Sequence, residues 1–274
     1  CLAANEITEI AGILNGTTNF ILTKMIHDQM SFGDALKMAQ ELGYAERNPA
    51  ADVEGRDTCR KICILASLAF GSHVYPNTVY TEGITNLTLE DVAYAEDWGG
   101  VIKLIGRAKK LQDGKLTAGV FPAFIGEHSQ LANIDDVFNG VLIRGDATGD
   151  VVFYGRGAGK FPTASAVVAD MIDVAKANTT SKSLSWEDSA ENHVVDIQTV
   201  PFSFYLRFCS ERGDECEAQL RELFPDSTWL ARKKQPENEW AFVTPVMTEL
   251  ELQKRLSRLN EADRLLNRIR LLDY

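Results

Sequence analysis

The chain of 274 residues is long enough to bury a substantial core and to form two domains. Its composition, 45% hydrophobic and 24% charged, is ordinary for a soluble globular protein. The formal net charge of −11 argues against a nucleic-acid or membrane-surface partner, because both need a basic patch. No apolar run reaches the roughly 18 residues of a membrane span. We therefore expect neither kind of partner.

The first part of the chain alternates between strand-like and helix-like patterns. Residues 7–14 predict a strand that ends at the tight sequence Asn15-Gly-Thr-Thr-Asn19. The polar stretch 43–55 contains turn-forming residues and predicts a loop. The expected helices are 18–28, 32–42, 56–70, about 89–111 and 162–177, the expected strands are Val79–Ile84, Leu116–Ile125, Val137–Ile143 and Val151–Tyr154, and a glycine-rich turn spans 155–159.

The second part of the chain follows a polar segment, residues 178–195, which predicts a linker. Beyond it, the expected strands are 199–209, 227–233, 239–244 and 267–272, and the expected helices are 214–224 and 247–262. This βαββαβ order is that of ferredoxin-like domains. The predicted fold class is therefore α+β, with a mixed-sheet catalytic and dimerisation domain at 1–180 and a ferredoxin-like domain at 196–274.

Five cysteines are scattered along the chain and form no CxxC pair. Their odd number and wide spacing favour reduced thiols over a disulfide framework or a zinc site. The four histidines are also far apart, so we expect no metal site. The first nine residues lack the basic start and apolar core of a secretory signal. These features predict a cytoplasmic protein.

Asp57 and Lys61 are four residues apart and therefore lie on one face of the helix predicted at 56–70. They could form a surface ion pair of little energetic value. The same row continues through Ile64, Leu65 and Leu68, so we expect it to run into the core. Partial burial would then favour the neutral amine and Asp57 the ammonium, a balance that suits a proton donor. Both interpretations remain open from spacing alone.

Three further carboxylates, Glu46, Asp52 and Glu54, precede this helix. They could bind the ammonium group of an amino-acid substrate. Solvated loop charges, favoured near a helix N-terminus, are the simpler explanation.

Several segments closely resemble the homoserine dehydrogenase family. The first is Gly12-Ile-Leu-Asn-Gly-Thr-Thr-Asn-Phe-Ile-Leu-Thr23. The second comprises Gly43-Tyr-Ala-Glu46, Asn48-Pro49, Asp52, Gly55, Asp57 and Arg60-Lys61. The third is Gly155-Arg-Gly-Ala-Gly159, followed by Pro162-Thr-Ala-Ser-Ala. The resemblance extends over about 1–178 and is weaker afterwards.

The resemblance implies a reversible reduction of aspartate 4-semialdehyde to homoserine with NADH or NADPH, in threonine and methionine biosynthesis. Lys61 matches the family's proton donor, with Asp57 beside it as part of the catalytic pair. Glu46 and Asp57 match substrate-binding carboxylates, and Asp52 lies next to them. The implied cofactor-binding residues are Gly16, Thr17, Gly43, Gly157 and Gly159. A placed ammonium would protonate the oxygen on which negative charge grows.

The turn Gly155–Gly159 has two interpretations. Lys160 stands where a dinucleotide fingerprint needs Gly or Ala, and Phe161 excludes a P-loop, which requires Ser or Thr after the lysine. From the residues alone it is a plain tight turn. The resemblance implies instead that the backbone of this turn lies close to the cofactor.

The resemblance also implies a dinucleotide-binding domain ahead of this chain, with a second lysine. We expect the chain alone to be inactive, either as a fragment or as one half of a split enzyme. Residues 196–274 resemble an ACT module, but Ser210–Asp214 lacks its Asp-x-Pro-Gly turn. A regulatory and a purely dimerising role both remain open, and we expect a homodimer or higher oligomer. The rival to an enzyme is an amino-acid sensor, which would not need the cluster from Glu46 to Lys61.

Overall fold

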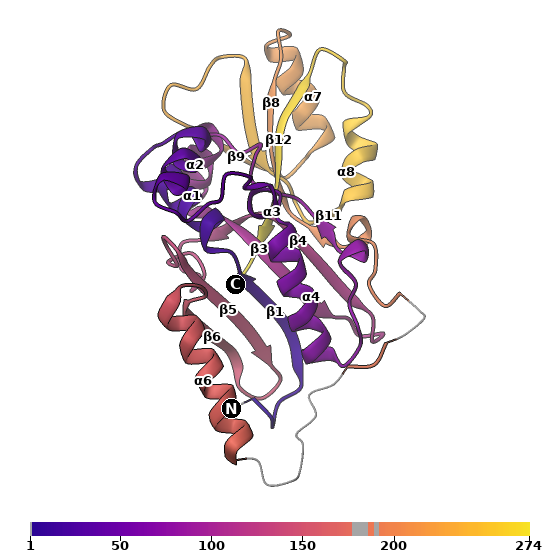
Figure 1. Ribbon diagram of the computed structural model, residues 1–274. Coiled ribbons are helices and arrows are strands. Elements are labelled where there is room, and N and C mark those ends of the chain that lie inside the picture. Colours follow the sequence, from indigo (N-terminus) through magenta and orange to yellow (C-terminus); the bar gives the residue numbers. More distant parts are fainter. Residues whose placement is uncertain (1, 177–185, 189–191) are drawn as a thin grey trace.

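The computed structural model describes residues 2–176, 186–188 and 192–274. One large mixed sheet organises them, in the strand order β6-β5-β1-β3-β4-β12-β8-β10-β9, with β2 beside β4 (Figure 1). Its strands are β1 (Ile7–Ile13), β2 (Tyr80–Thr81), β3 (Gly100–Lys110), β4 (Leu116–Gly126), β5 (Phe138–Gly145), β6 (Gly149–Arg156), β8 (Phe204–Cys209), β9 (Thr228–Leu230), β10 (Glu239–Val243) and β12 (Arg264–Leu272). The α+β class predicted from the sequence is confirmed.

The helices are distributed over both faces of this sheet. They are α1 (Gly16–His27), α2 (Phe32–Glu41), α3 (Ala50–Val53), α4 (Arg56–Phe70), α5 (Leu89–Trp98), α6 (Lys160–Lys176), α7 (Asp214–Leu223) and α8 (Glu249–Leu256), with short 3-10 turns at Pro76–Thr78 and Ile197–Thr199. A small second sheet pairs β7 (Pro201–Phe202) with β11 (Met247–Thr248). None of the described helices is long and apolar enough to cross a membrane.

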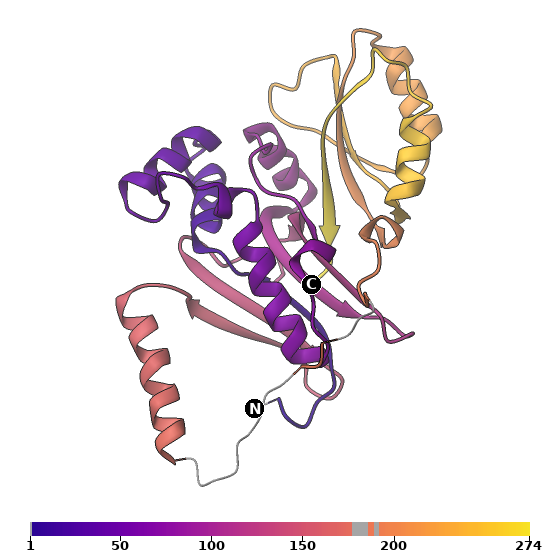
Figure 2. The same ribbon diagram turned by 45° about the vertical axis from the view of Figure 1, so that its right-hand side comes forward.

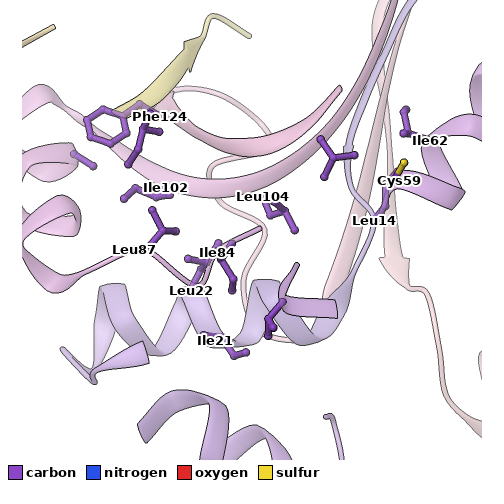
Figure 3. Packing of buried hydrophobic residues seen from close by; sticks show 14 of the residues in the cluster. Leu14, Ile21, Leu22, Cys59, Ile62, Ile84, Leu87, Ile102, Leu104 and Phe124 are labelled. Atoms are coloured by element: carbon purple, nitrogen blue, oxygen red, sulfur yellow. The ribbon is translucent and has the colours of Figure 1, made fainter. Parts of the chain in front are cut away.

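The sheet has a hydrophobic core on each face. One core includes Leu14, Ile62 and Leu104, where α1, α4 and α5 pack on the strands (Figure 3). The other includes Ile105 and Phe121, together with apolar residues of α7 and α8. Central strands are therefore buried on both sides, and even the lysine Lys103 of β3 is 0% exposed.

Burial on both faces explains the one large error in the predicted elements. The helix expected at 89–111 ends at Trp98, and residues 100–110 form β3. Gly99 ends the helix in the left-handed conformation, with φ +90°. A Cβ on Gly100 would lie 2.3 Å from the Ile125 carbonyl oxygen, so the strand pairing needs glycine there. Apolar residues lie on both faces of this strand, Ile102 and Leu104 in one core and Ile105 in the other, so the run lacks the strict alternation that identifies a half-buried strand.

Helix α4 is bounded by a glycine at each end. Gly55 and Gly71 flank it in the left-handed conformation, with φ +79° and +75°. Its buried face consists of Thr58, Cys59, Ile62, Cys63, Ala66 and Ser67. The row of Lys61 points outward, since Ile64 is 52% and Leu68 41% exposed. The expectation that this row runs into the core is wrong, because the apolar stripe of α4 is wider than the face that packs on the sheet.

The C-terminal elements follow the predicted βαββαβ order, as β8-α7-β9-β10-α8-β12. Strand β12 also pairs in parallel with β4, from Arg270 opposite Ala123 to Leu272 opposite Ile125. The sheet therefore continues from the first part of the chain into the second. The division into 1–180 and 196–274 stays a prediction, and most of the predicted linker at 178–195 lies outside the described residues.

Charged side chains are buried where the two parts meet. The Arg270 guanidinium lies 4.5 Å from the centre of the Tyr80 ring and 4.9 Å from that of Phe121. Glu249, the first residue of α8, forms ion pairs with both Arg268 and Arg270. Glu82, just after β2, pairs with Arg270 at 3.3 Å. Buried charges of this kind persist only when they are paired.

Helix α6 differs from the other long helices because none of its residues is buried. It stands beyond the edge strand β6, apart from the helices that cover the sheet (Figure 2). Its exposed apolar residues include Val167, Met171 and Val174. A surface of this kind is typical of a protein interface.

Candidate active site

Asn15, at the end of β1, lies at the centre of the cluster predicted from the sequence. Its side-chain nitrogen donates to Asp52 Oδ1 at 2.7 Å and to Asp57 Oδ2 at 2.9 Å. Its side-chain oxygen accepts from the backbone N–H of Thr18 at 2.9 Å and so caps α1. The strand end thus brings α3 and the start of α4 together, although their carboxylates are 37 and 42 residues away in sequence.

The ammonium group of Lys61 is fixed by two partners. It lies 2.7 Å from Asp57 Oδ2 and donates to the Leu14 carbonyl oxygen at 3.0 Å. The Lys61 side chain is 49% exposed and that of Asp57 29%. A lysine ammonium has three hydrogens, and the described residues take two of them. The third is available for a bound molecule.

The three predicted carboxylates act on one another electrostatically. Burial raises the pKa of Asp52, the Asn15 hydrogen bond and Lys61 lower it, and Asp57 and Glu46 raise it again. Glu46 is exposed and Asp52 and Asp57 are half-buried. Two neighbouring carboxylates beside one lysine leave negative charge to attract a cationic group. The arrangement can hold a substrate ammonium next to a proton donor.

A cavity of about 290 Å³ opens beside Lys61. Its lining consists of Leu14, Lys61, Ile64, Leu65, Asn139 and Gly157. The Gly157 N–H donates to Asn139 Oδ1 at 3.1 Å, and the Asn139 side-chain nitrogen donates to the Ile13 carbonyl oxygen at 3.0 Å. Asn139 therefore ties the glycine-rich turn to the end of β1. The cavity combines apolar walls with the only predicted proton donor.

The predicted cofactor-binding residues fall into two groups. Gly157 lines the cavity. Thr17 donates its hydroxyl to the Tyr44 carbonyl oxygen at 2.7 Å, which brings it close to the neighbouring Gly43. Gly16 begins α1, and a Cβ there would lie 2.8 Å from the Val137 carbonyl oxygen. Gly159 precedes α6 with φ +116°.

Gly157 is predicted to be intolerant of a side chain. A Cβ there would lie 2.2 Å from Asn139 Oδ1, whereas a Cβ on Gly155 would meet nothing within 4 Å. We expect Gly157→Ala to lower the free energy of unfolding by about 1–3 kcal/mol through overpacking, measured by urea denaturation. Gly155→Ala, the matched control, should stay within about 0.5 kcal/mol. Equal values for both variants would contradict the close approach.

Sequence reasoning missed the groups that hold these side chains. Asn15, Asn139 and the Leu14 carbonyl were not singled out as site residues. Asn15 carries one detectable signal, since it stands at a helix N-cap position. Asn139 lies inside a β-strand, and its partners come from other elements, so nothing local distinguishes it.

The site is thus one that can bind an amino acid and move a proton, on an α+β scaffold. The family model described as homoserine dehydrogenase matches residues 1–172. A homoserine dehydrogenase of Pseudomonas aeruginosa is 43% identical over 232 residues, which are 82% of this chain and 53% of that protein. The chain belongs to the homoserine dehydrogenase family. It spans about half the length of the curated relatives it matches.

Solved structures agree with this assignment. The crystal structure of a homoserine dehydrogenase from Thiobacillus denitrificans has a TM-score of 0.85 and 36% sequence identity, covering 99% of this chain and 65% of that one. A hyperthermophilic archaeal homoserine dehydrogenase, solved in complex with NADPH, has a TM-score of 0.51 and 27% identity, covering 64% of this chain and 49% of that one. The first similarity includes the C-terminal elements.

Proposed function

We propose that this chain forms the substrate-binding and catalytic part of an oxidoreductase that interconverts L-homoserine and L-aspartate 4-semialdehyde with NAD(P)(H), in threonine and methionine biosynthesis. One observation carries the proposal. In a member of this family, the Lys61 ammonium is held by Asp57 and the Leu14 carbonyl, next to Asp52 and beside a cavity.

The substrate's two ends meet different groups in this proposal. Glu46, Asp52 and Asp57 attract its ammonium group, since an amino acid carries a positive charge there. Lys61 faces the oxygen of C4: as the ammonium it gives this oxygen a proton during reduction, and as the neutral amine it receives the hydroxyl proton during oxidation. Asp57, 2.7 Å away, holds the lysine side chain in place. Because all three carboxylates attract an ammonium group, the site suits an amino acid better than a neutral aldehyde.

The cavity beside Lys61 fits the nicotinamide end of NAD or NADP. Leu14, Ile64 and Leu65 give it apolar walls, and the Gly157 backbone closes one side where a Cβ would not fit. When bound, the cofactor supplies or accepts the hydride. Leu14 and Ile64 exclude water from that side of the site, and Lys61 holds the proton at the substrate oxygen. These residues offer no phosphate-binding loop, so the phosphates need a further domain.

The exposed apolar face of α6 supports such a domain. Val167, Met171 and Val174 lie on a helix without a single buried residue, next to the turn that carries Gly157. Another protein surface would remove this apolar area from water. We infer that the dinucleotide-binding domain implied by the sequence resemblance packs on this face of α6.

Residues 196–274 are proposed to form an ACT-like module whose role is dimerisation. Its first βα turn is occupied by internal contacts, because Ser210 donates to Asp263 at 2.6 Å and Arg212 pairs with Asp263 at 2.8 Å. Groups engaged in this way are not free to bind an amino-acid effector. The homodimer and the cytoplasmic location expected from the sequence are part of the same proposal.

The test joins this chain to the part of the P. aeruginosa relative that lies outside the matched region. Oxidation of L-homoserine is followed by the absorbance of NADH or NADPH, for the joined protein and for this chain alone. We expect turnover by the joined protein only. An amino acid that binds the joined protein without any turnover would favour a sensor, and turnover by the chain alone would refute the need for a further domain.

A further inference from the structure

The side chain of Asn15 does more than cap a helix. Capping α1 needs only an acceptor for the Thr18 N–H, and Ser or Asp would serve as well as Asn. An amide adds two donor hydrogens, whereas a serine hydroxyl adds one on a shorter side chain and an ionised aspartate adds none. Both of the Asn15 amide hydrogens are directed at carboxylates, Asp52 at 2.7 Å and Asp57 at 2.9 Å. Asn15 itself is 5% exposed, and both bonds are partly buried.

We propose that Asn15 is a positioning residue of this site, which clamps the carboxylates of Asp52 and Asp57 together in register with Lys61. The inference rests on the proposed function, and it deepens it by assigning what sets the place of the substrate's ammonium group. Two adjacent residues hold the charged groups: the Leu14 carbonyl accepts from Lys61, and the Asn15 amide donates to Asp52 and Asp57. One turn of backbone at the end of β1 thus fixes all three groups.

The clamp is needed because like charges repel. Asp52 faces Asp57 from α4 and Glu46 from the segment before α3, and both disfavour its ionised form. Lys61 and Asn15 are the groups that favour it. Lys61 shares its charge with Asp57, with which it is in direct contact. A neutral donor between the two acids stabilises both without cancelling the negative charge that binds the substrate.

Asn15→Ser keeps the cap and replaces the two amide hydrogens by one hydroxyl hydrogen on a shorter side chain, so at least one of the two carboxylates loses its hydrogen bond. In the joined protein we expect the KM for L-homoserine to rise about tenfold, the size of one lost hydrogen bond to a charged group, with kcat changed less. Because the lost bond favoured the carboxylate, the acid limb of kcat/KM should move to higher pH. Asn15→Asp also keeps the cap but adds a third negative charge, so its shift should be larger. The control is Asn133→Ser, whose side-chain nitrogen donates only to backbone oxygens of Glu127 and Ser129.

A second measurement does not depend on turnover. In this chain, the Asp52 carboxyl is titrated by carbon NMR, and its midpoint should rise in both Asn15 variants. In an Asp52→Asn background, Asn15→Ser should no longer move the acid limb. An unchanged Asp52 midpoint, or an acid limb that moves equally in both backgrounds, overturns the clamp. If the wild-type joined protein fails to oxidise homoserine, the proposed function fails, and the NMR titration still decides the role of Asn15.

Discussion

Lys61→Ala is expected to lower kcat for homoserine oxidation by about two to four orders of magnitude in the joined protein. The ammonium lies 2.7 Å from Asp57 and 3.0 Å from the Leu14 carbonyl, so it is already oriented before substrate binds. Among the described residues that line the cavity, Lys61 is the only charged donor, and alanine removes it. The side chain is half-exposed, so the melting temperature should change little. Steady-state kinetics and thermal unfolding measure the two effects.

Two further variants distinguish catalysis from a surface ion pair. Lys37→Ala is the matched control, because Lys37 pairs with Glu41 four residues later on α2, at 4.0 Å in full solvent. It should leave kcat and KM unchanged. Glu46→Gln should mainly raise KM, as the loss of ground-state binding does. Wild-type kinetics for both Lys61→Ala and Glu46→Gln would mean that Asp57 and Lys61 form no more than a surface pair.

The sequence predicts well the elements that carry their own boundary signals. The helix predicted at 32–42 ends at Glu41, one residue earlier than predicted. Helix 56–70 coincides with α4, which glycines bound on both sides. The predicted helix 89–111 fails where β3 begins, because burial on both faces removes the alternation that identifies a strand. Local sequence patterns thus predict an element correctly where a residue next to it, such as a glycine, determines where the element ends.

The site was predictable in its charged residues and not in the groups that arrange them. Spacing placed Asp57 and Lys61 on one helix face, and the structure pairs them at 2.7 Å. The spacing did not show whether that face points to the core or to solvent. Ile62 and Ile64 are equally apolar, yet Ile62 is buried and Ile64 is exposed. The contacts of Asn15 join residues 37 and 42 positions apart, so they depend on how β1, α3 and α4 pack. Tertiary packing, not local sequence, sets these contacts.

The buried charges between the two parts of the chain lead to the other large expected effect. Glu249 is 5% exposed and forms ion pairs with Arg268 and Arg270 of β12. Removing it leaves two guanidinium groups in a poorly hydrated place, with Glu82 as their remaining carboxylate partner among the described residues. Breaking one side of a buried ion pair costs far more than the pair contributes, because the other charge stays buried.

We therefore expect Glu249→Ala to lower the free energy of unfolding by about 3–5 kcal/mol, measured by urea denaturation of this chain. The control, Glu222→Ala, breaks a pair with Arg258 at 4.0 Å in which both side chains are largely exposed, and should cost less than about 1 kcal/mol. A protease site introduced between 178 and 195 adds a second readout. After cleavage, the two pieces of the wild-type chain should co-elute, because β12 still pairs with β4 and Arg270 still contacts Glu82. In the Glu249→Ala variant, the two pieces should separate. The prediction is contradicted if this variant loses no more stability than the control and its pieces stay together. That result would show that the sheet pairing alone joins the two parts.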